Sequence, residues 1–508
     1  MLLHDAFLSS AQRLPDKVAI VSGAQRWSYR QLLNGALSLA QMLRSDGVVP
    51  GDRVVLLLEN RIEFVVALHG VLLAGAVCVP VSAFTKSDKL AFILGDTGAT
   101  ALLTQVQLTP AWALAIANSP AVVSCRIAGD TNAVGSDPRN KFWPLGDAPA
   151  PAIEESRIDQ DLAALIYTSG STGLPKGVML THLNMTSAWA SVQAYLGLRE
   201  DDVIGLALSP VYSYGLYNLL MGLGVGATVV LERAAAFPVK VAEMLERERV
   251  TVFPGVPTLF SSLLGMEELA RFDLRSVRLL TNAAAALSIN HVQRLRKTFP
   301  HAQLFSMYGL TECMRVTYLP PGEVEHRPGS VGRGMANQEH WLIDADKQRL
   351  PNGSNGELVV RGSHVMRGYW KRAAETEERF LEGAVDGERV LRTGDLFRTD
   401  DEGFLYFVAR MDDIIKTRGE KVAPREVENA IYELDGVVDC AVIGVADDSL
   451  GEAVKAFVTL RPGFELTARD IVKHCLARLE NHMAPKFVDF VDELPRTESG
   501  KIRHASLR

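Results

Sequence analysis

The sequence has few cysteines, and their arrangement excludes the sites that cysteines usually build. Its 508 residues include five cysteines, an odd number, and no two of them form a CxxC pair. Structural zinc sites and disulfide frameworks both need cysteines at short, regular spacings. The sequence therefore predicts neither of these, and it favours a protein of the reducing cytoplasm.

An excess of positive charge is also missing. The chain carries 53 lysines and arginines against 60 aspartates and glutamates, which gives a net charge of −7. A protein that binds nucleic acid without regard to sequence presents a basic stripe, so we expect no nucleic-acid partner. A small nucleotide remains compatible, because one local cationic site is enough to bind it.

The sequence further lacks a recognisable signal peptide or membrane segment. Its first residues include Asp5 and show no basic region followed by an apolar run. The stretch between Asp202 and Glu232 is uncharged and long enough to span a membrane. Pro210 and several glycines interrupt it, so a strand, a loop and a buried helix before a strand at 227–231 explain it better. We expect no integral membrane segment.

What the chain does contain is a regular alternation of helical and strand patterns. Strands are expected at 52–58, 77–81, 101–104 and 162–167, and helices at 30–43 and 63–74. The alternation resumes from 179 to about 310, after an expected irregular surface stretch at 126–156. Such a pattern indicates an α/β fold with a largely parallel sheet covered by helices.

The pattern changes in the last third of the chain. Short strands and turns between 328 and 408 predict a β-rich subdomain, and a compact α+β pattern follows it. We therefore expect a large N-terminal domain of residues 1–410 and a small C-terminal domain of residues 411–508.

The stretch Tyr167-Thr-Ser-Gly-Ser-Thr-Gly-Leu-Pro-Lys-Gly-Val178 has the clearest chemical character. Its glycines allow backbone N–H groups to turn toward one point, its hydroxyls add donors, and Lys176 adds a positive charge. A cradle for a polyphosphate and an ordinary polar surface loop both fit this composition. The spacing is not that of a Walker P-loop, because Leu-Pro-Lys follows Gly173.

The same stretch resembles the phosphate-binding signature of the adenylate-forming superfamily. That superfamily includes acyl-CoA synthetases, adenylation domains of peptide synthetases and firefly luciferases. Further motifs follow in the family's order, at 306–312, 392–396, 409–421 and 494–502, so that the resemblance covers essentially the whole chain. By itself each of these would be a strand end, a turn, a charged linker or a C-terminal tail.

The resemblance implies a nucleotide site built from these motifs. Tyr308 would stack on adenine, Thr311 would touch the α-phosphate or the substrate carboxylate, and Glu312 would bind Mg²⁺, for which one or two carboxylates suffice. Asp395 and Arg410 would contact the ribose. The residues that would hold the phosphates of ATP are Thr168, Ser169, Gly170, Ser171, Thr172, Gly173 and Lys176.

The C-terminal motifs imply a domain that moves. Asp412 would be the hinge, Lys416 and Gly419 would lie near the approach path of a thiol, and Lys501 would enter the active site during adenylation. One residue departs from the family pattern, since Ala409 stands where glycine is usual. The catalytic set implied in this way is Lys501, Thr311, Glu312 and Lys416.

The resemblance also implies an acid pocket, and its residues limit the substrate. The residues expected to line it are Tyr212, Ser213, Gly215, Ala283, Ala284 and Met307. Ser213 stands where α-amino-acid adenylation domains place an aspartate for the substrate ammonium, and burying an unpaired ammonium is costly. An α-amino acid is therefore disfavoured, whereas a secondary amine or a more distant amine remains open.

These features predict an AMP-forming ligase. It would convert a carboxylic acid and ATP to acyl-AMP and pyrophosphate, and then transfer the acyl group to a pantetheine thiol, which we expect to be CoA. The alternative is a stand-alone adenylation enzyme that loads an amino acid or another carboxylic acid onto the phosphopantetheine of a separate carrier protein. A luciferase-like oxidase has no oxygen-step signal here, and a non-catalytic regulator would be expected to lose Glu312 or Lys501.

Overall fold

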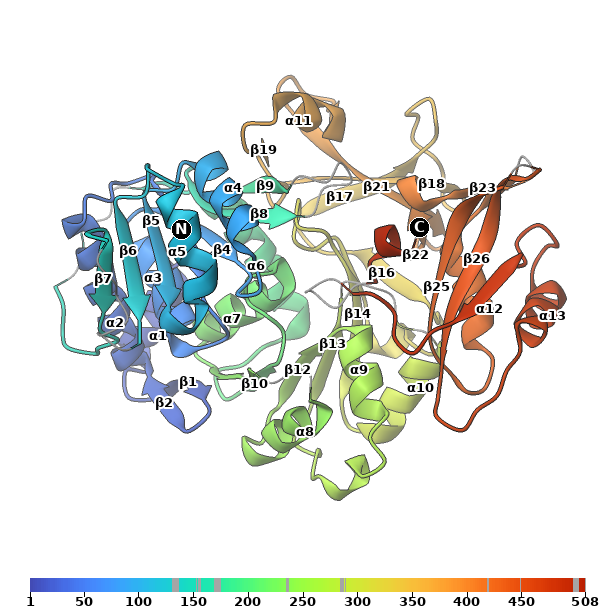
Figure 1. Cartoon of the computed structure of the whole chain (residues 1–508), viewed down its shortest axis with the longest axis horizontal. Helices are drawn as coiled ribbons and strands as arrows, with labels where there is room; N and C mark the ends of the chain where they lie inside the picture. Colours follow the sequence, from blue (N-terminus) through green and yellow to red (C-terminus); the bar gives the residue numbers. More distant parts are fainter. Residues whose placement is uncertain are drawn as a thin grey trace.

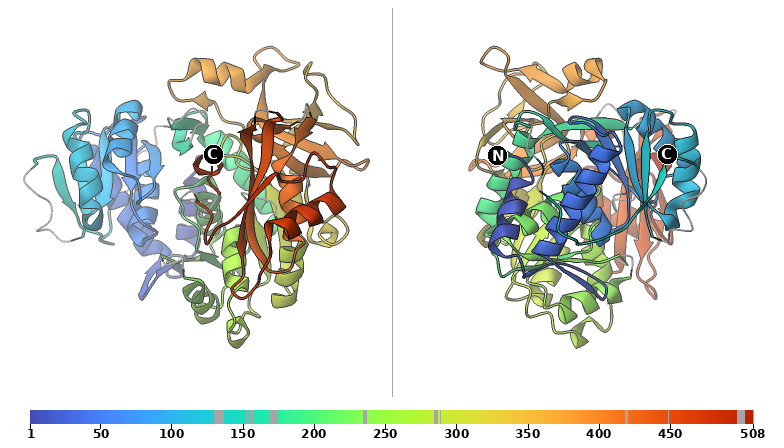
Figure 2. Two further views of the ribbon diagram at one scale, coloured as in Figure 1. Left: turned by 45° about the vertical axis from the view of Figure 1, so that its right-hand side comes forward. Right: turned by 90° about the vertical axis from the view of Figure 1, so that its left-hand side faces the viewer.

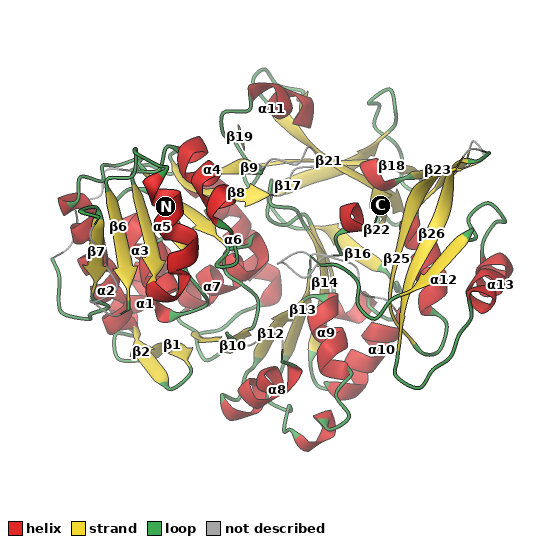
Figure 3. Ribbon diagram, in the orientation of Figure 1, coloured by secondary structure: helices red, strands yellow, loops and turns green. Residues whose placement is uncertain are grey.

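The computed structural model describes residues 1–129, 137–151, 153, 157–168, 175–233, 237–283, 287, 289–417, 420–447, 449–496 and 502–507. In these residues the chain forms three β-sheets with helices packed around them (Figure 1, Figure 3). The two large sheets are built by residues up to Arg410, and the small sheet begins at Ile415.

The first large sheet has eight strands in the order β19-β9-β8-β4-β3-β5-β6-β7. Strands β3 to β8 are parallel, whereas β9 and β19 run antiparallel to their neighbours. Its strands are β3 (Arg53–Leu57), β4 (Val77–Val81), β5 (Ala101–Gln105), β6 (Ser124–Ala128), β7 (Asn140–Trp143), β8 (Leu162–Thr168), β9 (Lys176–Thr181) and β19 (Gly368–Tyr369). The helices of this part are α2 (Tyr29–Ser45), α3 (Ile62–Leu73), α4 (Ser87–Thr97), α5 (Thr109–Ala117) and α6 (His182–Leu196).

Alternate residues of β3 face two different hydrophobic cores. Val54 and Leu56 belong to the core that includes α2 and α3, whereas Val55 and Leu57 belong to the core that includes α4 and α5. Successive side chains of a strand point to opposite faces, so a sheet covered on both faces produces an unbroken apolar run. This is the physical reason why the strand pattern at 52–58 reads as buried.

The second large sheet has fourteen strands and two halves. Its parallel strands are β1 (Val18–Ser22), β10 (Val203–Leu206), β11 (Thr228–Leu231), β12 (Val252–Gly255), β13 (Leu279–Asn282) and β14 (Gln303–Tyr308). Its antiparallel strands are β2 (Gln25–Ser28), β15 (Thr317–Leu319), β16 (Ser330–Gly334), β17 (Gln338–Ile343), β18 (Asn355–Gly362), β20 (Phe380–Glu382), β21 (Arg389–Thr399) and β22 (Leu405–Arg410). Ligands of open α/β sheets bind beyond the carboxyl ends of parallel strands, which draws attention to the residues after β13 and β14.

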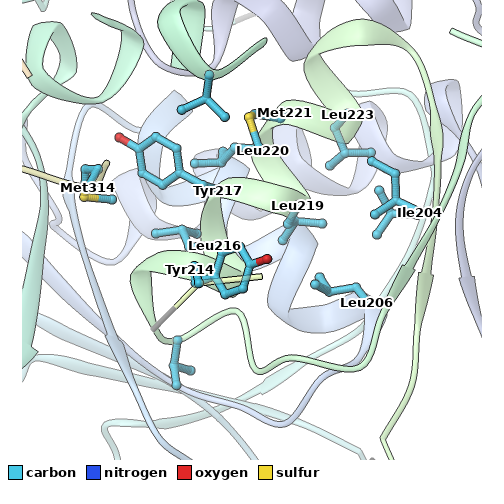
Figure 4. Close-up of a cluster of buried hydrophobic side chains, with 14 of the residues drawn as sticks. Ile204, Leu206, Tyr214, Leu216, Tyr217, Leu219, Leu220, Met221, Leu223 and Met314 are labelled. Carbon is cyan, nitrogen blue, oxygen red and sulfur yellow. The ribbon is translucent and has the colours of Figure 1, made fainter. Parts of the chain in front are cut away.

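Helices connect the parallel strands of this sheet. They are α7 (Ser213–Val225), α8 (Pro238–Arg247), α9 (Pro257–Leu264) and α10 (Ile289–Thr298), together with α1 (Asp5–Arg13) near the N-terminus and α11 (Ala373–Arg379) beside β20. Helix α7 is the buried helix expected in the uncharged stretch, and its apolar side chains pack against β10 (Figure 4). No helix of the described residues is long and apolar enough to cross a membrane.

The residues after Arg410 form a smaller unit with its own core. Its five-stranded sheet contains β23 (Ile415–Thr417), β24 (Glu420–Val422), β25 (Val437–Asp447), β26 (Gly451–Leu460) and β27 (Phe487–Phe490). Helices α12 (Pro424–Tyr432) and α13 (Ala468–Arg478) share a core with this sheet that is separate from the cores of the large sheets. Figure 2 shows this unit, in red, from two further sides.

Short 3-10 helices complete the described chain. They are η1 (Val106–Leu108), η3 (Leu269–Arg271), η4 (Pro321–Glu323), η5 (Met411–Asp413) and η6 (His504–Ser506). Helix η5 joins the last strand of the large sheet to the first strand of the small one.

The predicted fold class is confirmed, with one local correction. The stretch 126–156, predicted to be irregular, contains the end of β6 and all of β7, which pair in parallel. Trp143 at the end of β7 is buried. The many turn-forming residues around this short strand conceal it, because its apolar pattern spans too few positions to stand out.

Candidate nucleotide and acid-binding site

Two antiparallel strands flank the predicted phosphate-binding stretch. Strands β8 and β9 pair antiparallel, and their last paired residues are Thr168 and Lys176. Thr168 and Lys176, two of the predicted phosphate-binding residues, therefore lie directly opposite each other. The predicted phosphate-binding residues Ser169, Gly170, Ser171, Thr172 and Gly173 lie outside the described residues.

The carboxyl end of β8, which precedes the predicted phosphate-binding residues, is held by a network that no sequence motif indicates. The hydroxyl of Tyr167 donates to Oδ2 of Asp96 at 2.6 Å, and Nη2 of Arg372 donates to Oδ1 of the same carboxylate at 3.1 Å. Burial and the Asp96 carboxylate raise the pKa of Tyr167, so the phenol stays a hydrogen-bond donor. Asp96 comes from α4 and carries no motif signal, so only the tertiary structure identifies it.

Gly177 packs closely against Tyr167. A Cβ atom there would lie 3.1 Å from the ring of Tyr167, and the carbonyl of Gly177 accepts a 2.8 Å hydrogen bond from the N–H of Trp370. The strand β19 pairs with β9 at the edge of the sheet, and the residue after it continues this contact. This places Tyr369 directly beside the end of the phosphate loop.

Tyr369 lies between Lys176 and Glu312. Its hydroxyl donates to Oε1 of Glu312 at 2.8 Å, and Nζ of Lys176 lies 5.6 Å from the centroid of its ring. Burial, followed by the charge of Glu312, raises the pKa of Tyr369. Two residues that the resemblance assigns to the phosphate end of the site thus come together through a tyrosine that sequence reasoning missed.

The turn after β14 places Thr311 and Glu312 at the carboxyl end of a central parallel strand. Thr311 is half-buried and Glu312 is buried. The backbone carbonyl of Glu312 accepts a 2.7 Å hydrogen bond from the N–H of Met366, which ties the turn to the segment before β19. The turn is tight, since a Cβ at Gly309 would lie 2.4 Å from the carbonyl oxygen of Met314.

The residues present fit a magnesium ion that is shared with phosphates. A Mg²⁺ ion bridging phosphate oxygens needs one or two protein carboxylates and fills its other positions with water. Glu312 offers one such carboxylate beside Lys176. Groups of three or more His, Cys, Asp or Glu side chains that could hold a metal by themselves do not occur in the described part of the chain.

Asp395 accepts hydrogen bonds from two residues that the motifs place in the same site. The hydroxyl of Tyr308 donates to its Oδ2 at 2.6 Å, and Nε of Arg410 donates to its Oδ1 at 3.1 Å. The register of β21 and β22 explains the second contact, because Asp395 lies directly opposite Arg410. Burial and the Asp395 charge raise the pKa of Tyr308, and the same carboxylate raises the pKa of Arg410.

Gly394, the residue before Asp395, has a backbone conformation that favours glycine. Its φ of +69° favours glycine, and a Cβ there would lie 2.7 Å from Nη1 of Arg379. Nη2 of Arg379 donates to the carbonyl of Thr393 at 2.7 Å. The glycine of the Thr-Gly-Asp motif therefore has a structural reason in both its backbone angle and its neighbour.

The predicted acid pocket gathers residues from α7, β13 and β14. Ser213 is the first residue of α7 and follows Tyr212, and the next residue, Tyr214, donates its hydroxyl to the carbonyl of Thr281 at 2.8 Å. That bond joins the start of α7 to the end of β13, where Ala283 is buried. Ala284 lies outside the described residues.

Two further pocket residues have defined neighbours. Met307 of β14 is buried, and its sulfur accepts a hydrogen bond from the hydroxyl of Tyr195 at 3.0 Å. A Cβ at Gly215 would lie 2.2 Å from the carbonyl oxygen of Ser209, so only glycine allows α7 to start this close to the preceding loop.

The C-terminal residues of the predicted site are described only in part. Asp412 lies in η5, directly after the strand that ends at Arg410. Lys416 lies on β23 opposite Lys421, with its side chain exposed and its N–H donating to Oε2 of Glu452 at 2.7 Å. Gly419 and Lys501 lie outside the described residues, so their predicted roles stay predictions.

Comparison with known proteins identifies two family models along the chain. The model described as AMP-binding enzyme matches residues 7–370, and the model described as AMP-binding enzyme C-terminal domain matches residues 426–501. A long-chain-fatty-acid–CoA ligase of Bacillus subtilis is 30% identical over 98% of this chain and 93% of its own length. A feruloyl-CoA synthase of an Amycolatopsis species is 33% identical over 98% of this chain and 96% of its own.

The fold is also similar to solved structures. An anthranilate CoA ligase crystallised with anthranoyl-AMP superimposes with a TM-score of 0.89 at 26% identity, over 100% of this chain and 96% of that one.

Proposed function

Because this chain belongs to the family of AMP-binding enzymes within the adenylate-forming superfamily, we propose that it is an AMP-forming acid–CoA ligase. It converts a carboxylic acid, ATP and CoA to acyl-CoA, AMP and pyrophosphate. The relatives named above are themselves CoA ligases or synthases that match along nearly the whole chain, which supports an acyl-CoA ligase.

The reaction proceeds in two displacements. A carboxylate oxygen attacks the α-phosphorus of ATP, the bond to the β-phosphate oxygen breaks, and pyrophosphate leaves. The thiolate of CoA then attacks the acyl carbon of the mixed anhydride, and AMP leaves as its phosphate oxygen takes the bonding pair. Neither step needs a covalent enzyme intermediate, so positioning and electrostatic stabilisation can provide the acceleration.

We propose that two groups of contacting residues bind the two ends of ATP. Thr168 and Lys176 hold the phosphates together with residues 169–173, and Thr311 contacts the α-phosphate or the acid. At the other end Tyr308 stacks on adenine while Asp395 and Arg410 hold the ribose. Mg²⁺ bound at Glu312 would offset the negative charge of the phosphate oxygens.

The observation that carries these assignments is the convergence of separate motifs. Tyr308, Asp395 and Arg410 are joined by hydrogen bonds of 2.6 and 3.1 Å, although they come from three strands. Lys176 and Glu312 likewise come together at Tyr369, since Lys176 lies over its ring and Glu312 accepts a hydrogen bond from its hydroxyl.

We further propose that residues 1–410 and 411–508 are two domains with a hinge at Asp412. The separate core of the small sheet and the 3-10 turn at η5 support this division. Lys416 and Gly419 would then be presented for the thiol step, and Lys501 for adenylation, by rotation of one unit. Such closures can gate successive half-reactions.

We place the protein in the cytoplasm. The five cysteines, at positions 78, 125, 313, 440 and 475, are free and buried, as is usual for a protein of a reducing compartment.

The test is ATP–pyrophosphate exchange with the purified chain against fatty, aryl and dicarboxylic acids, followed by addition of CoA. Exchange with at least one acid and release of acyl-CoA support the proposal. Exchange that is followed by acyl transfer only to an added phosphopantetheinylated carrier protein would favour the stand-alone adenylation alternative. Failure of every acid to support exchange would contradict the ligase itself.

A further inference from the structure

Arg315 is a buried arginine beside the predicted acid pocket. Its side chain is only 5% exposed, yet no carboxylate of the described residues pairs with it. Nη1 donates to the carbonyl of Met314 at 3.2 Å, and Nε is buried without a hydrogen-bond partner. A buried charge without a counter-charge is strongly unfavourable, so a partner is expected from outside the protein.

Another arginine of the chain shows what a buried guanidinium normally has. Nε of Arg126 lies 2.7 Å from Oδ2 of Asp46, and its side chain is 11% exposed. Arg315 is buried at least as well and has no such partner among the described residues. Arg315 thus lacks the counter-charge that Arg126 has, and an anion would supply it.

The groups around Arg315 are aromatic and already engaged. The guanidinium carbon lies 4.8 Å from the ring centroid of Tyr214, whose hydroxyl donates to Thr281. The positive charge of Arg315 also opposes the rise that burial causes in the pKa of Tyr195 and of Tyr217. The hydroxyl of Tyr195 donates to the sulfur of Met307 and that of Tyr217 to a backbone carbonyl. Figure 4 labels Tyr214 and Tyr217 on α7 and Met314 within one cluster of buried side chains.

The turn after β14 explains how Arg315 reaches this place. Met314 has a left-handed φ of 62°, and the N–H of Val316 returns to the carbonyl of Tyr308 at 2.9 Å. Glu312 on this turn contacts Tyr369, whereas Arg315 contacts Tyr214 at the start of α7. One short turn thus serves the phosphate end of the site and the acid pocket.

We propose that Arg315 binds a second carboxylate of the acid substrate, so that this ligase activates dicarboxylic acids. The inference rests on the proposed ligase function and specifies its substrate class. A carboxylate accepts two parallel N–H bonds from one edge of a guanidinium, and the Nε edge of Arg315 contains the unpartnered donor. The first carboxylate of the acid remains available to react with ATP.

Two other roles for Arg315 make different predictions. If it held the reacting carboxylate, its loss would affect every acid equally. If it only packed on Tyr214 as a cation–π partner, its loss would lower stability without changing the preference among acids. Only the binding of a second carboxylate predicts that loss of Arg315 changes the preference between dicarboxylic and monocarboxylic acids.

The first experiment uses the wild-type chain and two matched pairs of acids. Pyrophosphate release with CoA is measured for hexanoate against adipate and for benzoate against terephthalate. A buried site built for hydrogen bonding rejects an analogue that lacks the bonding group by a factor on the order of 10⁴. We expect kcat/KM to favour a dicarboxylate over its matched monocarboxylate; a preference for the monocarboxylate in both pairs would overturn the proposal.

The second experiment compares Arg315→Gln, Arg315→Lys and the control Arg278→Gln. Arg278 pairs with buried Asp202 away from the pocket, so its variant reports the effect of losing a buried arginine contact elsewhere. We expect Arg315→Gln to raise KM for the preferred dicarboxylate at least about 30-fold with a smaller change in kcat. KM for the matched monocarboxylate should change little, and Arg315→Lys should restore part of the loss.

The outcomes separate this inference from the proposed function. Equal losses for both acids of a pair, or unchanged KM in Arg315→Gln, would overturn the inference while leaving the ligase intact. An absence of pyrophosphate release by the wild-type chain with every acid would overturn the ligase function, and the inference with it. Thermal unfolding of each variant identifies losses that come from misfolding, and the wild-type comparison needs no variant.

Discussion

The hydroxyl of Tyr308 donates a 2.6 Å hydrogen bond to Oδ2 of Asp395, a residue 87 positions later in the chain. The bond joins the end of a parallel strand to the antiparallel half of the same sheet. Arg410 donates to the other oxygen of the carboxylate, so Asp395 is oriented from both sides. A residue proposed for the ribose is thereby held by one proposed for adenine.

Loss of the Tyr308 hydroxyl should weaken ATP binding. A hydrogen bond to a charged group contributes about 1.5–3 kcal/mol, so Tyr308→Phe should raise KM for ATP about tenfold or more while the ring can still stack. The measurement is the ATP dependence of pyrophosphate exchange. Tyr432→Phe is the matched control, because Tyr432 donates at 2.6 Å to Asp439 in the C-terminal unit. An equal KM in the wild type and Tyr308→Phe would contradict the assignment.

Loss of the Asp96 charge should weaken ATP binding indirectly, because Asp96 positions the end of β8 and is not proposed to contact ATP. Asp96 accepts from Tyr167 and Arg372, so Asp96→Asn weakens a charged contact at the carboxyl end of β8. We expect KM for ATP to rise several-fold, by about 1–2 kcal/mol in binding free energy, with little change in KM for the acid. The comparison variant is Asp16→Asn, which breaks an exposed pair with Arg30 and should change neither constant. A shift in KM for the acid alone would argue against positioning of the phosphate loop.

Lys501 should be needed for adenylation and dispensable for thioester formation. A positioned cation at a developing charge lowers a barrier by about 3–4 kcal/mol, so Lys501→Ala should slow adenylate formation at least about a hundredfold. The same variant should still convert supplied acyl-AMP and CoA to acyl-CoA. Retained ATP–pyrophosphate exchange in Lys501→Ala would remove this residue from the site.

Rigidity at Asp412 should separate the two half-reactions. Proline fixes φ near −65°, so Asp412→Pro restricts the turn between β22 and β23. We expect pyrophosphate exchange to continue while acyl-CoA formation stops. Asp413→Ala in the same turn is a control that removes a neighbouring side chain without fixing the backbone. Loss of both half-reactions together in Asp412→Pro would count against a simple hinge.

Stability should fall in mild acid, and His364 is one of the buried histidines that contribute to this fall. This residue is 1% exposed, neither ring nitrogen has a hydrogen-bond partner, and burial lowers its pKa from 6.5 to about 4. Between these values the unfolded imidazole binds a proton that the folded one does not. The stabilising contribution is therefore complete above pH 6.5 and is lost as the pH falls toward 4, by up to about 3 kcal/mol.

The variant His364→Leu tests that explanation. It should reduce the slope of the unfolding free energy against pH between 6.5 and 4, as measured by urea titrations at several pH values, and the slope that His69 and His291 cause should remain. His301→Leu at an exposed position is the matched control. An unchanged slope in His364→Leu would assign the acid sensitivity to other groups.

The local patterns of the sequence predict much of the fold correctly because their physical causes are local. The apolar run at 52–58 indicates a strand covered on both faces, and Val54 and Val55 do face two separate cores. The uncharged stretch after Asp202 indicates a strand, a buried helix and a strand, which are β10, α7 and β11. The strand β7 escapes prediction because it is short and lies among turn-forming residues.

The site shows the same division between local and distant causes. Tyr308, Glu312, Asp395 and Arg410 stand in recognisable motifs, so the sequence alone is enough to predict a role for them. Tyr369 and Asp96 stand in none, since their importance comes from contacts with residues far away in the chain. Arg315 escapes notice for a related reason, because an arginine after a motif reads as a surface charge until its burial is known.

The order of the motifs along the chain is enough to predict that it uses ATP to activate an acid, because each motif keeps its residues and their spacing in one short stretch. How the motifs complete one another follows only from the folded chain. Tyr369 connects Lys176 to Glu312, Tyr308 orients Asp395, and Arg315 lies buried with no carboxylate partner among the described residues. Such contacts depend on strand register and burial. These arise from packing between distant segments, so no single stretch of the sequence predicts them.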